Sequence, residues 1–230
     1  MYIIVAGNIS EDNEVSLTKL GFKIIPTFQN TNVLKPLQYH ADMQLSLLGN
    51  TLVCEPTMYE FYAKSLRGSG IKLVCGKNQT QCNYPKDVAY NIKVIENNVF
   101  HNFKHTDPVL LEHIKGYQLI DVSQGYSGCS ICRAGRDAII TSDTVIHAAA
   151  ISNGIDSLLI SPGHISLPGF DYGFVGGASL WHKGCVYFFG DVTKHPDYAR
   201  MERFFQKQGS RICTLGTGEL FDYGSAFTFD

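Results

Sequence analysis

Three residues of this sequence have types and spacing that could support covalent catalysis. His40 and Asp42 stand two positions apart in His40-Ala-Asp42, and Cys129 stands in Gly128-Cys-Ser-Ile-Cys132. A cysteine thiolate is a nucleophile, a histidine can protonate a departing amine, and a carboxylate can hold a cationic group. In a strand, His40 and Asp42 would point to the same side and could face one substrate. Two structural alternatives stay open: Cys129 as a small buried apolar residue, and His40 with Asp42 as a hydrogen-bonded pair entering a hairpin.

The pair Cys129 and Cys132 also has the spacing of a zinc or redox dithiol motif. In a strand, however, positions three apart face opposite sides, and the sequence has no second Cys-x-x-Cys. We therefore expect neither a metal nor a cofactor. The seven cysteines are an odd number, which argues against a secreted disulfide framework and favours a reduced, cytoplasmic protein.

Composition narrows the classes of partner. The 230 residues carry a formal net charge of −2, so no basic surplus predicts nucleic-acid binding. No run of 18 apolar residues predicts a membrane span. Phosphate-binding glycine motifs are also absent from the positions where a strand would lead into a helix. These features leave a small-molecule substrate as the expected partner if the protein is an enzyme, and they leave the oligomeric state open.

One pattern recurs five times and predicts the elements that must position these residues. A helical stretch ends at a glycine, and an apolar strand follows within a few residues; a glycine there supplies the left-handed residue that often ends a helix. The helices have start signals at Ser10, at a capping box from Thr57 to Glu60, at Asp107-Pro108, at Ser142-Asp143 and at His195-Pro-Asp197. The five glycines are Gly21, Gly70, Gly116, Gly154 and Gly209.

A hairpin with a Gly or Asn turn is expected between each of these strands and the next helix. The first four hairpins fall in residues 40–53, 90–99, 128–140 and 176–188. The fifth, Tyr223–Phe229, runs out at the C-terminus, and Met1–Gly7 supplies the strand that it lacks. The sequence thus predicts an α/β fold of five ββαβ units in a single domain, residues 1–230, with the fifth unit closed by the N-terminal strand.

Five ββαβ units closed in a ring resemble the pentein fold of the guanidino-group-modifying enzymes, a five-fold pseudosymmetric propeller. That superfamily includes deiminases, dimethylargininase and amidinotransferases. The resemblance implies an active site on the pseudo-fivefold axis, where a Cys nucleophile, a His-x-Asp or His-x-Glu histidine and acidic residues come from different repeats. It therefore implies a Cys-dependent hydrolase or amidinotransferase on a small guanidino or amino-acid-like substrate, with Cys129, His40 and Asp42 as catalytic residues.

The same resemblance supplies the other candidate site residues and the competing function. Asn91, Gly177 and Ser225 correspond to Asp42 and Cys129 in their own units, and a further carboxylate is expected from Glu219 or Asp222. The substrate-binding candidates are Asp42, Asn91, Glu219, Asp222 and Ser225. Cys129 lies in the third unit, whereas the family's enzymes usually carry the nucleophile near the C-terminus. The alternative is a non-catalytic binding protein on the same fold, similar to the ribosome anti-association factor.

Two further segments are notable. The loop Leu167–Phe174 is rich in glycine and aromatic residues and could either wall a pocket or turn a tight corner. Trp181 and His182 fall at the tip of the fourth hairpin, where we expect them to be exposed and without a function.

Overall fold

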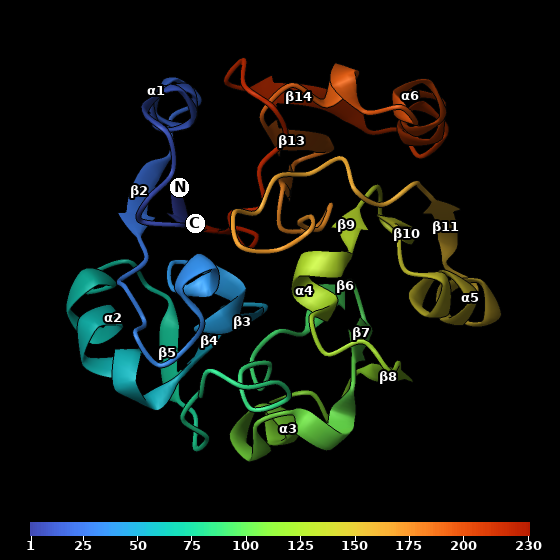
Figure 1. Cartoon of the computed structure of the whole chain (residues 1–230). Helices are drawn as coiled ribbons and strands as arrows, with labels where there is room; N and C mark the ends of the chain where they lie inside the picture. The colour runs from blue at the N-terminus through green and yellow to red at the C-terminus, as the bar shows by residue number, and fades with distance from the viewer.

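A computed structural model describes all residues, 1–230, and contains five three-stranded sheets arranged around a central axis (Figure 1). In every sheet the middle strand pairs antiparallel with a hairpin partner and parallel with the strand that follows the helix. The hairpin strands are β3 (Leu45–Leu48) with β4 (Thr51–Cys54), β6 (Lys93–Ile95) with β7 (Asn98–His101), β9 (Cys132–Arg133) with β10 (Ala138–Thr141), β12 (Ser179–His182) with β13 (Cys185–Phe189), and β15 (Phe227–Phe229) with β1 (Tyr2–Val5). The predicted five-fold ββαβ propeller is confirmed.

The third strand of each sheet begins shortly after one of the five predicted glycines. These strands are β2 (Lys23–Pro26), β5 (Lys72–Cys75), β8 (Gln118–Asp121), β11 (Asp156–Leu159) and β14 (Arg211–Leu215). Four of the glycines adopt a positive φ between 70° and 84°, which favours glycine because it has no Cβ. Gly116 is the exception and has an ordinary φ.

Five helices lie on the outside of the ring (Figure 1). Three of their five predicted start signals provide a side-chain cap. They are α1 (Glu11–Lys19), α2 (Tyr59–Ser65), α3 (Pro108–His113), α5 (Thr144–Ser152) and α6 (Tyr198–Lys207). Ser10, Asp107 and Asp143 each accept hydrogen bonds from backbone N–H groups of the first turn. The predicted capping box is wrong: Glu55 caps a 3₁₀ helix, η3 (Pro56–Met58), which leads into α2.

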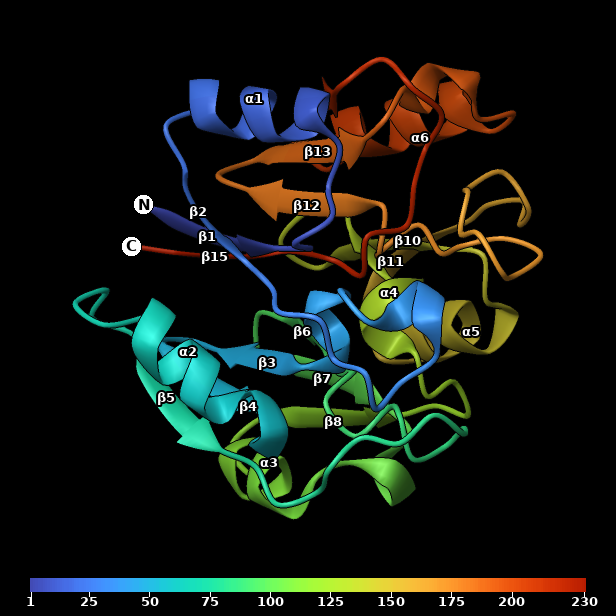
Figure 2. The same ribbon diagram turned by 60° about the vertical axis from the view of Figure 1, so that its left-hand side comes forward.

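The two ends of the chain lie side by side in one sheet. Tyr2 of β1 pairs with Phe229 of β15, and Figure 2 shows the termini emerging together. This pairing covers an edge that either terminal segment would otherwise expose. The ring is therefore closed by hydrogen bonds between segments more than 220 positions apart, and its assembly needs the whole chain.

The apolar core lies between the sheets and their helices. In the largest cluster, Met201 and Phe205 of α6 pack with Val186 and Phe188 of β13, and all four are fully buried. Burying such a side chain contributes roughly 1.5–3 kcal/mol. The outer helices therefore hold the sheets in place and leave the inner strands free to surround the axis.

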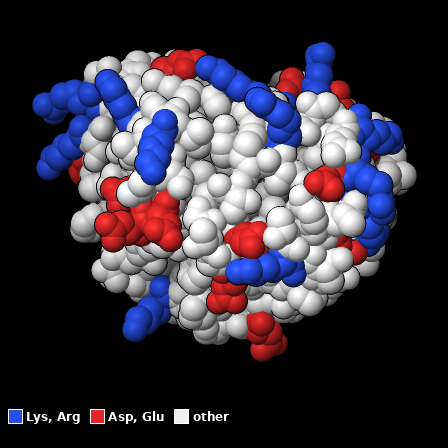
Figure 3. Space-filling model, turned by 90° about the horizontal axis from the view of Figure 1, so that it is seen from above, with Lys and Arg blue, Asp and Glu red and all other residues white.

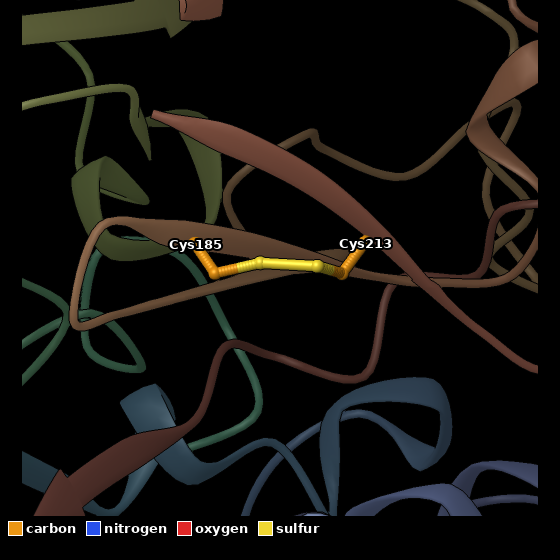
Figure 4. The surroundings of a disulfide bond; sticks show 2 residues. All are labelled: Cys185 and Cys213. Atoms are coloured by element: carbon orange, nitrogen blue, oxygen red, sulfur yellow. A yellow bond between two sulfur atoms is a disulfide. The ribbon is translucent and has the colours of Figure 1, made fainter. Parts of the chain in front are cut away.

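A disulfide joins Cys185 of β13 to Cys213 of the neighbouring β14 (Figure 4). The prediction that all seven thiols are reduced is therefore wrong, and five cysteines are free. The two half-cystines come from segments 28 residues apart, so neither their spacing nor the total count reveals the pair.

Charged side chains of both signs are scattered over the face in Figure 3, separated by uncharged surface. This face shows no continuous basic patch of the kind that binds nucleic acid. None of the helices has the length and apolar character needed to cross a membrane.

Candidate active site on the ring axis

The structure brings His40, Asp42 and Cys129 together at the centre of the ring. One polar side-chain atom from each residue, a ring nitrogen, a carboxylate oxygen and the sulfur, lies within 4.8 Å of the others. All three residues are at most 2% exposed. The local structure differs from the strand that we predicted. His40 precedes and Asp42 belongs to a 3₁₀ helix, η2 (Ala41–Met43), while Cys129 belongs to a short inner helix, α4 (Ser127–Ser130).

Asp42 is the hydrogen-bond centre of this cluster. Its Oδ2 accepts from the Cys129 thiol at 2.9 Å and from the Ser225 hydroxyl at 2.8 Å. Its Oδ1 is buried and has no partner. Asp42 Oδ2 therefore links the third and fifth units to the first by hydrogen bonds, and Asp42 Oδ1 can still accept a hydrogen bond.

Asn91 positions Cys129 and is not available to a substrate. Its Oδ1 accepts from the backbone N–H of Gly128 at 2.7 Å and of Cys129 at 3.3 Å. Its Nδ2 lies 3.4 Å from the Cys129 sulfur and 3.3 Å from that of Met43. Because the amide is fully used inside the protein, our prediction that Asn91 contacts substrate is replaced by a positioning role.

Asp222 is the fifth-unit carboxylate that reaches the cluster. It accepts from the backbone N–H groups of Phe174 at 2.8 Å and Gly224 at 2.9 Å, and its Oδ1 lies 4.0 Å from His40 Nδ1. A Cβ at Gly177 would stand 1.8 Å from Asp222 Oδ1, so the fourth unit must have glycine there. Gly177 also connects its neighbours, since its N–H donates to the Cys129 carbonyl and its own carbonyl accepts from Ser225 N–H.

The other predicted carboxylate, Glu219, is not part of the site. Its side chain is exposed, and it lines a surface hollow beside Asp12 and Asn13 of α1. The prediction that Glu219 binds substrate is therefore wrong. The reason is local: Gly218 and Glu219 form the outward part of the loop before the chain turns in at Leu220, and only Asp222 returns to the axis.

Burial sets the protonation of the cluster at neutral pH. It raises the pKa of Asp222 to about 7 and raises that of Asp42, although the nearby His40 opposes the shift at Asp42. It lowers the pKa of His40, so the imidazole is neutral. Burial, followed by the charges of Asp42 and Asp222, raises the pKa of the Cys129 thiol well above its usual value. In the free protein the sulfur is a thiol that donates to Asp42.

Two cavities with no lining residue in common reach the cluster. The first, which we call the loop cavity, has a volume of about 630 Å³ and contains His40 and Asp222. Its wall includes the predicted loop at Leu167 and Phe170, so that loop does wall a pocket. The second, which we call the strand cavity, has about 300 Å³ and contains Asp42. Cys129 itself lines neither cavity.

Sequence reasoning also missed several residues around the axis. Trp181 and His182 are half-buried in β12 and line the strand cavity, so the prediction that they are exposed at a hairpin tip is wrong; the turn is Lys183-Gly184. Lys93 lines the same cavity. Lys93 is the first residue of β6 and Asn91 precedes that strand, so the predicted place of Asn91 on the axis gave no signal for Lys93.

The set of His40, Asp42 and Cys129 offers nitrogen, oxygen and sulfur donors of the kind that bind zinc. The sulfur, however, already donates to Asp42 Oδ2 at 2.9 Å, which is a direct hydrogen bond. Cys132 does not join these donors: it starts β9, is buried, and its pKa is raised to about 11 by burial.

Solved structures share this architecture along almost their whole length. An amidinotransferase from the saxitoxin biosynthetic pathway of Microseira wollei is 12% identical, with a TM-score of 0.59 over 98% of this chain and 93% of that one. An adduct of dimethylarginine dimethylaminohydrolase with S-methyl-L-thiocitrulline is 8% identical, with a TM-score of 0.61 over 99% of both chains. Agmatine deiminase of C. jejuni is 7% identical, with a TM-score of 0.58 over 93% of this chain and 87% of that one.

These likenesses define the class of the protein: it has the pentein fold of the guanidino-group-modifying enzymes. No curated protein matches the sequence. Residues 4–227 match the profile described as "Family of unknown function (DUF6873)", and the chain belongs to that family.

Proposed function

We propose that this protein is a Cys-dependent hydrolase or amidinotransferase acting on a small guanidino or amino-acid-like substrate. The observation that carries the proposal is the convergence of His40, Asp42 and Cys129 within 4.8 Å on the axis of a pentein ring. Amidinotransferase, hydrolase and deiminase are the activities that the three similar structures are named for. Asp42 and Asp222 supply the carboxylates that a cationic guanidinium would need.

In this proposal the loop cavity receives the substrate. Its apolar wall, from Leu34, Pro36, Leu167 and Phe170, suits the carbon chain of a small molecule. His40 and Asp222 stand at its inner end. Asp42 and Cys129 do not line this cavity, so a guanidinium held by Asp222 would reach the Cys129 sulfur only after His40 shifts and opens the way to Asp42.

Substrate binding would itself ionise the nucleophile. The free thiol is held neutral by burial and by two nearby carboxylates. A guanidinium about 4 Å from the sulfur would favour the thiolate by roughly 4 kcal/mol at an effective dielectric constant near 20. His40, neutral in the free protein, would accept the thiol proton. A Cys–His pair completed by the substrate needs no permanently charged cysteine.

The reaction then proceeds in two steps. The thiolate attacks the guanidinium carbon, a C–S bond forms, and the C–N bond to the departing amine breaks as His40 returns its proton to that nitrogen. His40 next removes a proton from water, which attacks the same carbon; the C–S bond breaks and releases a ureido product. In an amidinotransferase, an acceptor amine takes the place of that water.

The second candidate is a non-catalytic binding protein on the same ring. The observation that favours it is that Cys129 lines neither cavity and has a raised pKa. In that case the Cys129–Asp42–Ser225 contacts would hold the axis together as a buried polar network.

A substrate panel with matched cysteine variants separates the two. Ammonia and ureido product are measured with arginine, agmatine, methylarginines and shorter guanidino acids. Cys129→Ser should abolish turnover, whereas Cys132→Ser should retain it, because Cys132 is also buried but belongs to β9 and not to the cluster. Asp42→Asn should raise KM by at least about tenfold, since a hydrogen bond to a charged group contributes about 1.5–3 kcal/mol.

The outcomes are distinct. Turnover that survives Cys129→Ser would assign the nucleophile to another residue. No turnover with any substrate, together with no acceleration of Cys129 alkylation by those guanidino compounds, would favour the binding protein.

We keep a cytoplasmic location as part of this proposal. The observation against it is the Cys185–Cys213 disulfide, because such bonds are rare where glutathione and thioredoxin keep thiols reduced. Thiol counting on protein trapped with an alkylating agent inside cells would decide between a reduced and an oxidised compartment.

A further inference from the structure

The strand cavity is built from residues of all five units and includes Asp42. Every sheet contributes residues of its inner strand. They include Leu47 of β3, Lys93 and Val94 of β6, Arg133 of β9, Leu180, Trp181 and His182 of β12, and Phe227 and Thr228 of β15. A space of about 300 Å³ with a wall from each unit is a defined pocket, large enough for a small metabolite.

Several polar groups that line this cavity have no hydrogen-bond partner in the protein, among them the Lys93 ammonium, His182 Nε2 and the acceptor Asp42 Oδ1. Lys93 makes no hydrogen bond or ion pair within the protein, and Trp181 Nε1 is buried without a partner. Arg133 is differently placed: it pairs with Glu96, donates to the Gly135 carbonyl, and covers the Trp181 ring at 4.0 Å. The remaining cation of the cavity is Lys93, which is half-buried; burial lowers its pKa and the nearby Asp42 opposes that shift. An ammonium without a hydrogen-bond partner in the protein can bind an anion from solution through charge-assisted hydrogen bonds.

The remaining lining limits the chemistry of that acceptor. Leu47, Ile92, Val94, Leu180 and Phe227 form an apolar wall beside the donors. A carboxylate carries a single negative charge, and its oxygens accept hydrogen bonds from the Lys93 ammonium. A doubly charged phosphate would place more negative charge close to Asp42, which lines the same cavity.

We propose that the strand cavity binds a small monocarboxylate with a short aliphatic body. Its carboxylate pairs with Lys93, and its carbon chain lies against Leu47, Val94 and Phe227. This site shares Asp42 with the candidate active site but belongs to a different cavity, and it does not depend on the proposed function. It needs only the cavity and the Lys93 ammonium.

The chain provides its own reporter, because Trp181 is its single tryptophan. The probes are butyrate, butylamine and 1-butanol, which share a carbon chain and differ in charge. Each is titrated into the full-length protein in a buffer free of other carboxylates, and tryptophan fluorescence is followed. We expect a saturable change with butyrate and none with butylamine or butanol.

Two substitutions of Lys93 and one control substitution test whether the fluorescence response to butyrate depends on the Lys93 charge. Lys93→Met, which keeps the length and loses the charge, should weaken butyrate binding by at least about tenfold, the size expected for a lost charge-assisted hydrogen bond. Lys93→Arg should stay within a few-fold of wild type. Lys72→Met removes an exposed lysine from strand β5 and should change nothing.

The proposal is overturned if butyrate gives no saturable change, if butylamine saturates instead, or if Lys93→Met binds butyrate as wild type does. The comparison of the three probes uses wild-type protein alone, so the test stands even if Lys93→Met does not fold. Activity of the candidate active site does not enter either measurement, so the two proposals can fail separately.

Discussion

Gly177→Ala should destabilise the protein because the added methyl group has no room at the ring axis. The new Cβ would lie 1.8 Å from Asp222 Oδ1, whereas ordinary contacts are about 3.4 Å or longer, so the carboxylate must move. Moving it strains the packing, at about 1–3 kcal/mol, and weakens its hydrogen bonds from Phe174 and Gly224. We expect a loss of about 3 kcal/mol in the free energy of unfolding, measured by urea denaturation at pH 7. For a chain of this size that lowers the urea midpoint by roughly 1 M.

Gly116→Ala is the matched control, because it makes the same chemical change in open space. Gly116 has no atom within 4 Å of its would-be Cβ and has an ordinary φ. Its free energy of unfolding should change by less than about 0.5 kcal/mol. Equal stability of the two variants would refute the view that the fourth unit has glycine at position 177 because the axis has no room for a side chain.

Three further predictions concern ionisation and oxidation. Asp222 has a pKa of about 7 in the folded protein against an ordinary 3.8, so its contribution to stability is lost as pH rises through 7; relative to wild type, Asp222→Asn should gain up to about 4 kcal/mol between pH 4 and pH 7.5 in denaturation curves. Without substrate, iodoacetamide at pH 7.5 should modify the exposed Cys82 at least about tenfold faster than the buried Cys129, as followed by peptide mass spectrometry; equal rates would contradict the buried neutral thiol. Thiol titration of unfolded protein should give five thiols before reduction and seven after it, and seven at the outset would show that Cys185 and Cys213 are not bonded.

The fold was predictable because each unit repeats the same local signals. A helix start, a glycine and an apolar strand are short-range features, and their recurrence fixes the number of units. The strand after Gly70 begins at Lys72, and the strand after Gly209 begins at Arg211, each two positions beyond its glycine. The closure by β1 and β15 followed from counting strands, because each end of the chain lacked a partner that the other could supply.

The site was only partly predictable, because its geometry depends on departures from the repeat. His40 and Asp42 occupy a 3₁₀ turn, and the order of the axial residues is set by contacts between units. Nothing local distinguishes Glu219, which is exposed, from Asp222, which is buried three positions later. The disulfide was missed for the same reason, since strand pairing between β13 and β14 brings Cys185 and Cys213 together.

The axial cluster has two faces, and they are chemically different. The face towards the loop cavity has His40 with the carboxylate of Asp222, which suits a cation. The face towards the strand cavity has Asp42 together with Lys93, whose ammonium can pair with an anion although burial lowers its pKa. The Cys129 thiol lines neither cavity and donates a hydrogen bond to Asp42. A carboxylate that pairs with Lys93 would withdraw that positive charge from Asp42 and favour its protonated form. A cation at the loop face would favour the ionised form of the same residue. Ligands at the two faces should therefore oppose each other through Asp42, and butyrate should slow any reaction of Cys129 that guanidino compounds accelerate.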